Sequence, residues 1–175
     1  MTIPARKVRL VGTAEYRDEA EAILDVPGDA ALVERGVLRS LVLRCPDGCG
    51  QTLVMNLDPR AGKAWRFHRR QGAVSLFPSV WRDGGCDSHF VVWKDNILWC
   101  DRYEDGNEEP DYDPAIELLV LDALPADRFV DPGTIAMQLD LIGWDVAKAL
   151  RRLAEEGHAK EGEDLAKGTF QRARA

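Results

Sequence analysis

Four cysteines and a histidine fall at spacings that suit a metal site. Cys45 and Cys49 share one Pro- and Gly-containing turn, Cys86 stands three residues before His89, and Cys100 follows later in the chain. Tetrahedral zinc takes four thiolate or imidazole ligands, usually from two short turns. The sequence therefore predicts structural zinc, with the first pair spaced one residue wider than in the commonest knuckle.

Two ligand sets fit this pattern. In one, zinc binds Cys45, Cys49, Cys86 and His89, and Cys100 is a small core residue. In the other, zinc binds all four cysteines, and His89 is free for chemistry. Spacing alone leaves both sets open.

A β-hairpin is predicted around His89. Residues 90–93 and 97–100 are apolar and flank the loop 94–96, which has a residue suited to left-handed backbone. Counting outward from a three-residue loop places His89 opposite Asp101, within side-chain reach. An aspartate at this position would orient the imidazole and raise its basicity.

The same register has a consequence for Cys100. It pairs Phe90 with Cys100, and the pleat then puts Cys100 on the face of Ser88 and Cys86. This arrangement suits the four-cysteine site.

Ser79 is the candidate nucleophile for a free His89. It follows Pro78, directly after a strand predicted over residues 73–77, and a strand end holds a side chain rigidly yet accessibly. Serine, histidine and aspartate together perform acyl transfer, with His89 as base and Asp101 as orienting acid. The simpler interpretation is that Ser79 caps a turn.

The pattern of apolar residues and turn residues predicts an α+β fold. A helix is expected over 15–24, and the tryptophans at 65, 81, 93 and 99 are expected to fill the core of a small antiparallel sheet. Strands are expected at 8–12, 37–43, 51–57, 65–68, 73–77, 90–93 and 97–100. The predicted domain 1–102 is thus a sheet built around a zinc knuckle.

The rest of the chain differs in composition. Residues 103–115 are acidic and rich in helix breakers, which predicts a linker. Residues 116–175 predict a helical tail in which helices over 135–141 and 145–156 resemble a winged helix. Within the winged-helix-like segment the acidic and basic residues nearly cancel, so protein docking is favoured over DNA binding.

Charge and hydropathy exclude several classes of protein. The net charge is −7 in 175 residues, which argues against a nucleic-acid or anionic-membrane partner. No long apolar run and no signal-peptide core are found. A cytoplasmic protein is expected, in which reduced thiols favour metal over disulfides.

Three segments carry a resemblance to a known family. They are Cys45-Pro-Asp-Gly-Cys49-Gly, Leu76-Phe-Pro-Ser79-Val80 and Cys86-Asp-Ser88-His89-Phe90, with Trp99 closing the hairpin. They resemble a family of small bacterial cysteine-knuckle proteins with a CGCG-type turn, an L-x-P-S-[IV] segment and a C-x-S-H-[FY] segment. Members are associated with operons for ubiquitin-like proteins and for E1-like and E2-like enzymes. The resemblance covers residues from about 37 to 102.

The resemblance implies a function and favours one ligand set. Family members often have a cysteine where this chain has Asp47 and lack one at Cys100, which implies that Cys100 replaces the missing zinc ligand and leaves His89 free. It further implies a serine-type peptidase or esterase that matures or removes a ubiquitin-like modifier. The alternatives are a zinc-ribbon adaptor that docks conjugation enzymes and, less favoured, a zinc-ribbon and winged-helix transcription factor.

Overall fold

The computed structural model describes residues 4–101 and 107–174. Its contacts divide the chain into two compact units, Met1–Pro110 and Asp111–Ala175. Part of the predicted linker, residues 103–106, lies outside the described residues, and 107–113 form no helix or strand. The domain boundaries at 102 and 116 stay predictions.

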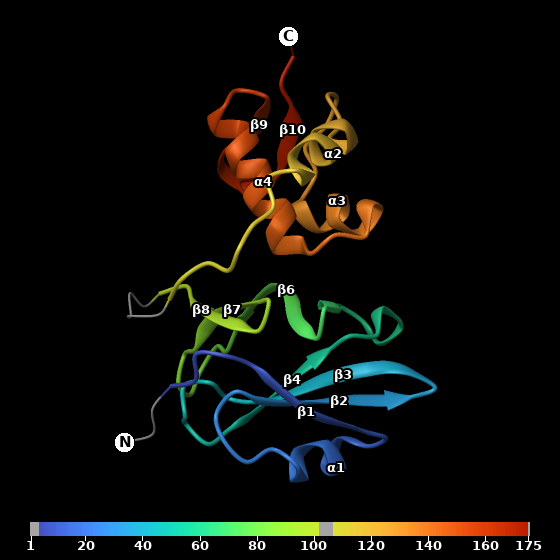
Figure 1. Ribbon diagram of the computed structural model, residues 1–175, viewed down its shortest axis with the longest axis vertical. Coiled ribbons are helices and arrows are strands. Elements are labelled where there is room, and N and C mark those ends of the chain that lie inside the picture. The colour runs from blue at the N-terminus through green and yellow to red at the C-terminus, as the bar shows by residue number, and fades with distance from the viewer. Residues whose placement is uncertain (1–3, 102–106, 175) are drawn as a thin grey trace. The chain divides into compact units, whose positions relative to one another are not determined.

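The first unit begins with a four-stranded sheet in the order β1-β2-β3-β4 (Figure 1). Strands β1 and β2 are parallel, and the other neighbours are antiparallel. A crossover containing the short helix α1 joins β1 to β2. The elements are β1 (Arg9–Ala14), α1 (Arg17–Ala22), β2 (Asp29–Arg35), β3 (Val37–Arg44) and β4 (Thr52–Asn56), followed by a 3-10 turn, η1 (Pro59–Ala61).

Strand β2 was not predicted from the sequence. Its first five residues are all buried, so it lacks the apolar–polar alternation that marks a half-exposed strand. Asp29, the first residue of β2, accepts hydrogen bonds from the backbone N–H groups of Asp25 and Val26. It also forms an ion pair with Arg9. Burial opposes ionisation, but these donors together lower the pKa of Asp29, so the carboxylate ties the crossover to the sheet.

A second four-stranded sheet has the order β5-β6-β7-β8 and is antiparallel throughout. The predicted end of the strand at Phe77 is wrong, because β6 continues through Pro78 to Trp81. The pairing of β6 with β7 shifts between Leu76 and Val80, which accommodates a proline that has no N–H to donate. The strands are β5 (Arg66–Arg70), β6 (Ala73–Trp81), β7 (His89–Trp93) and β8 (Asn96–Trp99).

The hairpin register differs from the prediction by one residue. Lys94 and Asp95 have φ angles of 49° and 66°, so they form a two-residue turn with both central residues left-handed. Phe90 consequently pairs with Trp99, and the Cys100 N–H donates to the His89 carbonyl at 2.9 Å. Cys100 is therefore opposite His89, and not opposite Phe90 as expected. The predicted pairing of His89 with Asp101 is likewise wrong, because Asp101 lies one residue beyond the partner of His89.

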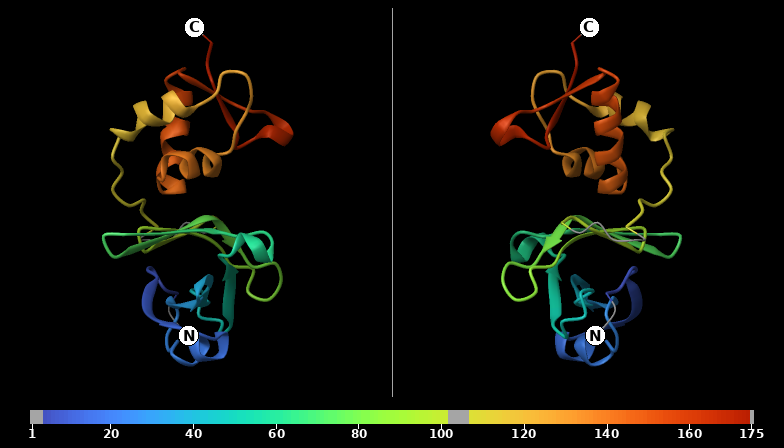
Figure 2. Two further views of the ribbon diagram at one scale, coloured as in Figure 1. Left: turned by 90° about the vertical axis from the view of Figure 1, so that its right-hand side faces the viewer. Right: turned by 90° about the vertical axis from the view of Figure 1, so that its left-hand side faces the viewer.

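The two sheets stack on one core (Figure 2). Leu41 and Met55 of the first sheet belong to the same buried cluster as Leu76 and Phe90 of the second. The other face of the first sheet is covered by α1 through Ala20 and nearby apolar residues. The predicted α+β class with antiparallel sheet is confirmed, but two sheets replace the single small one.

The tryptophans do not all fill the core as predicted. Trp93 and Trp99 are buried, with 2% and 6% of their surface exposed. Trp65 is half-buried against the core, and Trp81 is 65% exposed. Trp81 lies on the outer face of β6, because its neighbour Val80 points into the core.

The second unit packs three helices and a two-stranded sheet around its own core. Asp131 caps α3 by accepting from the Thr134 N–H, and Asp140 ends it in left-handed backbone. Strand β10 also bridges to Val130. The elements are α2 (Ile116–Ala123), α3 (Pro132–Leu139), α4 (Gly143–Glu155), β9 (Ala159–Glu161), η2 (Asp164–Ala166) and β10 (Phe170–Arg172). The winged-helix character of this segment stays a prediction.

None of the helices in the described parts of the chain has the length and apolar character needed to cross a membrane.

Candidate active site and thiol cluster

Ser79, His89 and Asp101 form a connected chain of side chains on the second sheet. His89 Nε2 lies 3.1 Å from Ser79 Oγ, and His89 Nδ1 lies 3.1 Å from Asp101 Oδ2. The structure thus brings together the three residues that sequence reasoning nominated for acyl transfer. Their separations are those of a nucleophile, a base and an orienting acid.

The two contacts assign opposite roles to the imidazole nitrogens. An ionised carboxylate can only accept hydrogen bonds, so the Asp101 contact requires a proton on Nδ1. Nε2 of the neutral ring then carries the lone pair and accepts from the Ser79 hydroxyl. This is the tautomer that a general base needs.

The pleat of the sheet explains why these groups meet. Trp81 pairs with His89 and Val80 pairs with Phe90. Ser79, Trp81 and His89 therefore share the outer face, while Val80 and Phe90 face the core. The ring centroids of Trp81 and His89 are 5.9 Å apart, so the exposed indole lies beside the imidazole.

Three cysteines form a separate cluster that could hold a metal ion. The Sγ atoms of Cys45, Cys49 and Cys86 all lie within 4.8 Å of one another, and those of Cys45 and Cys86 are 3.7 Å apart. Two sulfurs bound to one tetrahedral zinc at 2.3 Å would lie about 3.8 Å apart. The turn after β3 and the loop before β7 thus supply ligands at a spacing that fits a metal.

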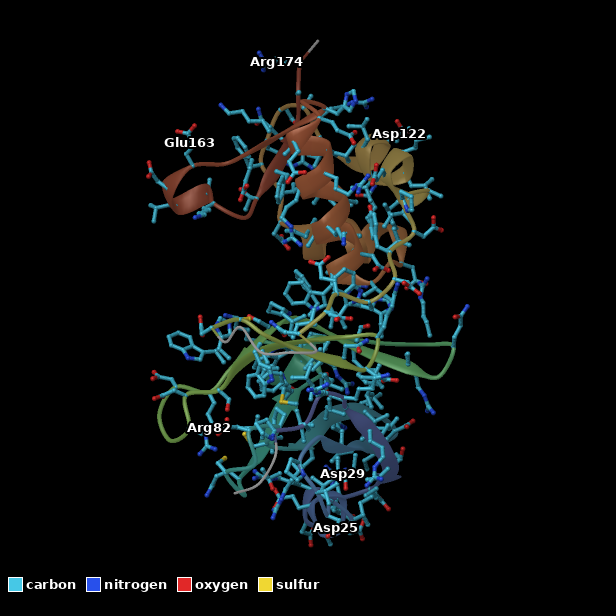
Figure 3. The ribbon with its side chains drawn as sticks, turned by 60° about the vertical axis from the view of Figure 1, so that its left-hand side comes forward. Asp25, Asp29, Arg82, Asp122, Glu163 and Arg174 are labelled. Carbon is cyan, nitrogen blue, oxygen red and sulfur yellow. The ribbon has the colours of Figure 1, made fainter. Side chains whose placement is uncertain are left out.

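Two polar side chains support the thiols. Ser88 is fully buried, and its Oγ lies 2.9 Å from Cys86 Sγ and 3.7 Å from Cys45 Sγ. The Arg82 guanidinium donates to Cys49 Sγ at 3.4 Å and reaches Cys86 Sγ at 3.8 Å. The Arg82 side chain is labelled in Figure 3. Ser88 and Arg82 both favour thiolates through hydrogen bonding, and Arg82 adds positive charge.

The thiols differ in their readiness to ionise. Burial raises the pKa of Cys45 to about 12. Burial also opposes ionisation of Cys86, but hydrogen bonds from Ser88 and the neighbouring thiols outweigh it and lower the Cys86 pKa to about 7. A metal ion would supply the charge that keeps the buried Cys45 ionised.

Cys100 does not join this cluster, contrary to the expected four-cysteine site. Its Sγ is not among the clustered ligand atoms of the described residues, and the residue is exposed. The physical reason is the one-residue difference in hairpin register, which moves a side chain to the other face of the sheet. Cys100 shares the face of His89, whereas Ser88 and the thiols lie on the opposite face.

The alternative ligand set with His89 is not assembled either. Both ring nitrogens of His89 are engaged by Ser79 and Asp101, and His89 is absent from the thiol cluster of the described residues. Only the part shared by the two predicted sets, Cys45, Cys49 and Cys86, comes together.

Sequence reasoning missed the partners of the thiols. The sequence pattern places Ser88 on the face of Cys86 but predicts no contact between Ser88 and the thiols, and it assigns no role to Arg82. A signal was present in each case, because Ser88 stands two residues after Cys86 and Arg82 four residues before it. Short loops return such neighbours to the same ligand cluster.

A comparison with known protein families finds a match over part of the first unit. Residues 16–100 match a family model described as bacterial ubiquitination-like system serine protease (BubE). The match includes Ser79, His89 and all four cysteines but ends before Asp101 and the second unit. Comparisons with curated proteins and with solved structures find no match.

Proposed function

We propose that this chain is a serine-type peptidase or esterase that matures or removes a ubiquitin-like modifier in a bacterial conjugation pathway. The observation that carries the proposal is the contact of His89 with Ser79 on one side and Asp101 on the other, each at 3.1 Å. The described family of the matching segment supports both the serine chemistry and the ubiquitin-like pathway.

The chemistry follows from the hydrogen-bond roles. As Ser79 Oγ attacks the scissile carbonyl carbon, His89 Nε2 takes the hydroxyl proton and a C–O bond forms. The imidazolium returns that proton to the leaving amine as the C–N bond breaks. Water then attacks the acyl carbon while Nε2 takes its proton. That proton passes to Ser79 Oγ as the acyl C–O bond breaks, which releases the carboxylic acid and restores the Ser79 hydroxyl. Asp101 holds the ring and stabilises its positive charge during both steps.

We further propose that the ion held by Cys45, Cys49 and Cys86 is zinc and that its role is structural. Three thiolates suit zinc, and a fourth ligand would complete its tetrahedral coordination. The thiols are on the opposite face of β7 from Ser79, so the metal would stabilise the loop before His89 without contacting substrate. His89 directly follows Ser88, which contacts two of the thiols.

Two measurements on the purified full-length protein test the peptidase proposal. A fluorophosphonate probe is expected to label Ser79 in the wild type and in a Ser40→Ala control, but not in Ser79→Ala or His89→Ala. A ubiquitin-like protein carrying a short C-terminal extension should be cleaved with the same dependence on Ser79.

Labelling no greater than in Ser79→Ala, together with an intact precursor, would overturn the peptidase proposal. The non-catalytic adaptor would then be the better account, because an adaptor needs no reactive serine.

A further inference from the structure

An apolar cavity opens directly beside Ser79. It has a volume of about 200 Å³, and an apolar site of about 150 Å³ is large enough for a benzene-sized group. The cavity is lined by Lys63, Ala64, Trp65, Pro78, Ser79 and Trp81.

The cavity exists because two neighbouring segments separate at this point. The pairing of β5 with β6 ends at Arg66 and Phe77. Beyond it, Asn56 of β4 holds the preceding loop away from β6: the Asn56 carbonyl accepts from the Trp65 N–H at 2.8 Å. The Asn56 side chain donates to the Lys63 carbonyl at 3.0 Å. The backbone and the side chain of Asn56 therefore both hold the loop away from β6.

The walls are fixed around the nucleophile. Trp65 is half-buried against the core, and its Nε1–H donates to the Ser79 carbonyl at 3.3 Å. Trp81 forms another wall, and its 65% exposure leaves the apolar surface of the indole accessible next to His89. Exposed aromatic surface that lines a cavity commonly marks a binding site.

We propose that this cavity is the specificity pocket of the enzyme and receives a bulky apolar side chain of the substrate. The inference rests on the proposed function, because Ser79 itself lines the cavity. The side chain belongs to the residue on the acyl side of the scissile bond. Its Cα is one bond from the carbon that Ser79 attacks, whereas the Cα on the leaving side is two bonds away.

The lining also excludes other occupants. Trp65, Trp81, Pro78 and Ala64 offer a charged group no polar partner in exchange for its hydration. An acidic side chain would meet only the exposed Lys63, in a pair that water screens. Lys63 is exposed and is the one charged residue of the lining, so a basic side chain would meet a like charge. A leucine- or phenylalanine-sized side chain fits both the volume and the chemistry.

Peptide substrates that differ in one residue test the pocket. N-acetyl-peptide aminomethylcoumarins with Gly, Leu, Phe, Asp or Lys on the acyl side are compared by kcat/KM. Leu and Phe are expected to exceed Gly by about 10- to 200-fold, the range that an apolar pocket contributes. A preference for Gly, Asp or Lys would overturn the inference.

Filling the cavity provides the matching variant. Ala64→Trp is expected to bring the ratio of the Leu to the Gly substrate close to one, while Ala61→Trp, outside the lining, keeps the wild-type ratio. Trp81→Ala provides a second variant because its ring is exposed and its loss leaves the core intact. The Trp81→Ala substitution should lower kcat/KM for the Leu substrate more than kcat/KM for the Gly substrate. Unchanged ratios in both would overturn the pocket.

Fluorophosphonate labelling separates the two proposals. Labelling at Ser79 without a preference for apolar substrates would overturn the specificity pocket and leave the peptidase proposal standing. Absence of labelling above Ser79→Ala overturns both.

Discussion

Asp101 contacts Nδ1 of the His89 imidazole from a position that is much more exposed to solvent than His89 itself. The His89 side chain is 28% exposed, whereas that of Asp101 is 73% exposed. An exposed ion pair contributes at most about 1 kcal/mol, because water screens the charges. Asp101 is therefore expected to contribute much less to the rate than His89 does.

The rates of two variants should reflect this difference. His89→Ala is expected to lower kcat by about 100- to 10,000-fold, because it removes the general base. Asp101→Asn should lower kcat by only about 2- to 10-fold, since about 1 kcal/mol corresponds to roughly fivefold in rate. Hydrolysis of a peptide coumarin measures both, with Asp83→Asn as the control for loss of a nearby exposed carboxylate. Equal losses in His89→Ala and Asp101→Asn would contradict this ranking.

At the scale of elements, two loops determine where β7, the strand that starts with His89, begins. The turn between β3 and β4 carries Cys45 and Cys49, and the loop between β6 and β7 carries Cys86 and Ser88. Because His89 opens β7 immediately after Ser88, its position depends on how that loop is held. A metal ion between the two loops would fix the start of β7 relative to the first sheet.

Metal content is expected to distinguish the cysteines. Wild-type protein purified without a metal-affinity tag should contain about one zinc per chain and lose thermal stability on chelation. Cys45→Ser should retain less than about a tenth of an equivalent and melt at a lower temperature. Cys100→Ser should keep both metal and stability, because Cys100 faces away from the cluster. Elemental analysis and thermal unfolding provide the readouts.

The metal proposal would be contradicted by either of two results. One is a wild-type protein without zinc that still melts cooperatively. The other is a Cys100→Ser variant that loses metal as fully as Cys45→Ser does.

At the scale of the whole molecule, the second unit has an acidic balance that argues against DNA. Residues 111–175 contain thirteen Asp and Glu against eight Lys and Arg. On α4, Arg152 Nε pairs with Glu117 Oε1 at 2.7 Å, and Lys148 Nζ lies 5.4 Å from the Tyr112 ring centroid. Two cationic side chains that could contact phosphates thus interact with other residues of the same unit. This favours protein docking over DNA binding as the role of the unit.

Duplex DNA should accordingly bind weakly. In about 0.15 M salt the full-length protein is expected to show no affinity tighter than roughly micromolar, the range of non-specific binding. Fluorescence anisotropy with duplexes of mixed sequence measures it. Nanomolar, sequence-dependent binding that Arg151→Glu abolishes would favour the transcription-factor alternative.

The local sequence was sufficient to predict those parts of the site whose residues lie close together in the chain. The Cys45–Cys49 turn and the Cys86–His89 segment were recognisable from spacing. The hairpin predicted that Asp101 lies near His89, and the two side chains do contact each other, although Cys100 and not Asp101 is opposite His89. These features depend on short loops, whose geometry is encoded by nearby residues.

Tertiary structure decided which faces and neighbours these residues have. A one-residue change in hairpin register put Cys100 on the face of His89, and the shift in β6 brought Ser79 to Nε2. Trp81 looks like a core residue by composition, yet its place in the pleat puts it on the outer surface beside Ser79. Local periodicity gives the alternation along a strand, but the turn geometry and the sheet-on-sheet packing select the register, and the register determines which face meets the core.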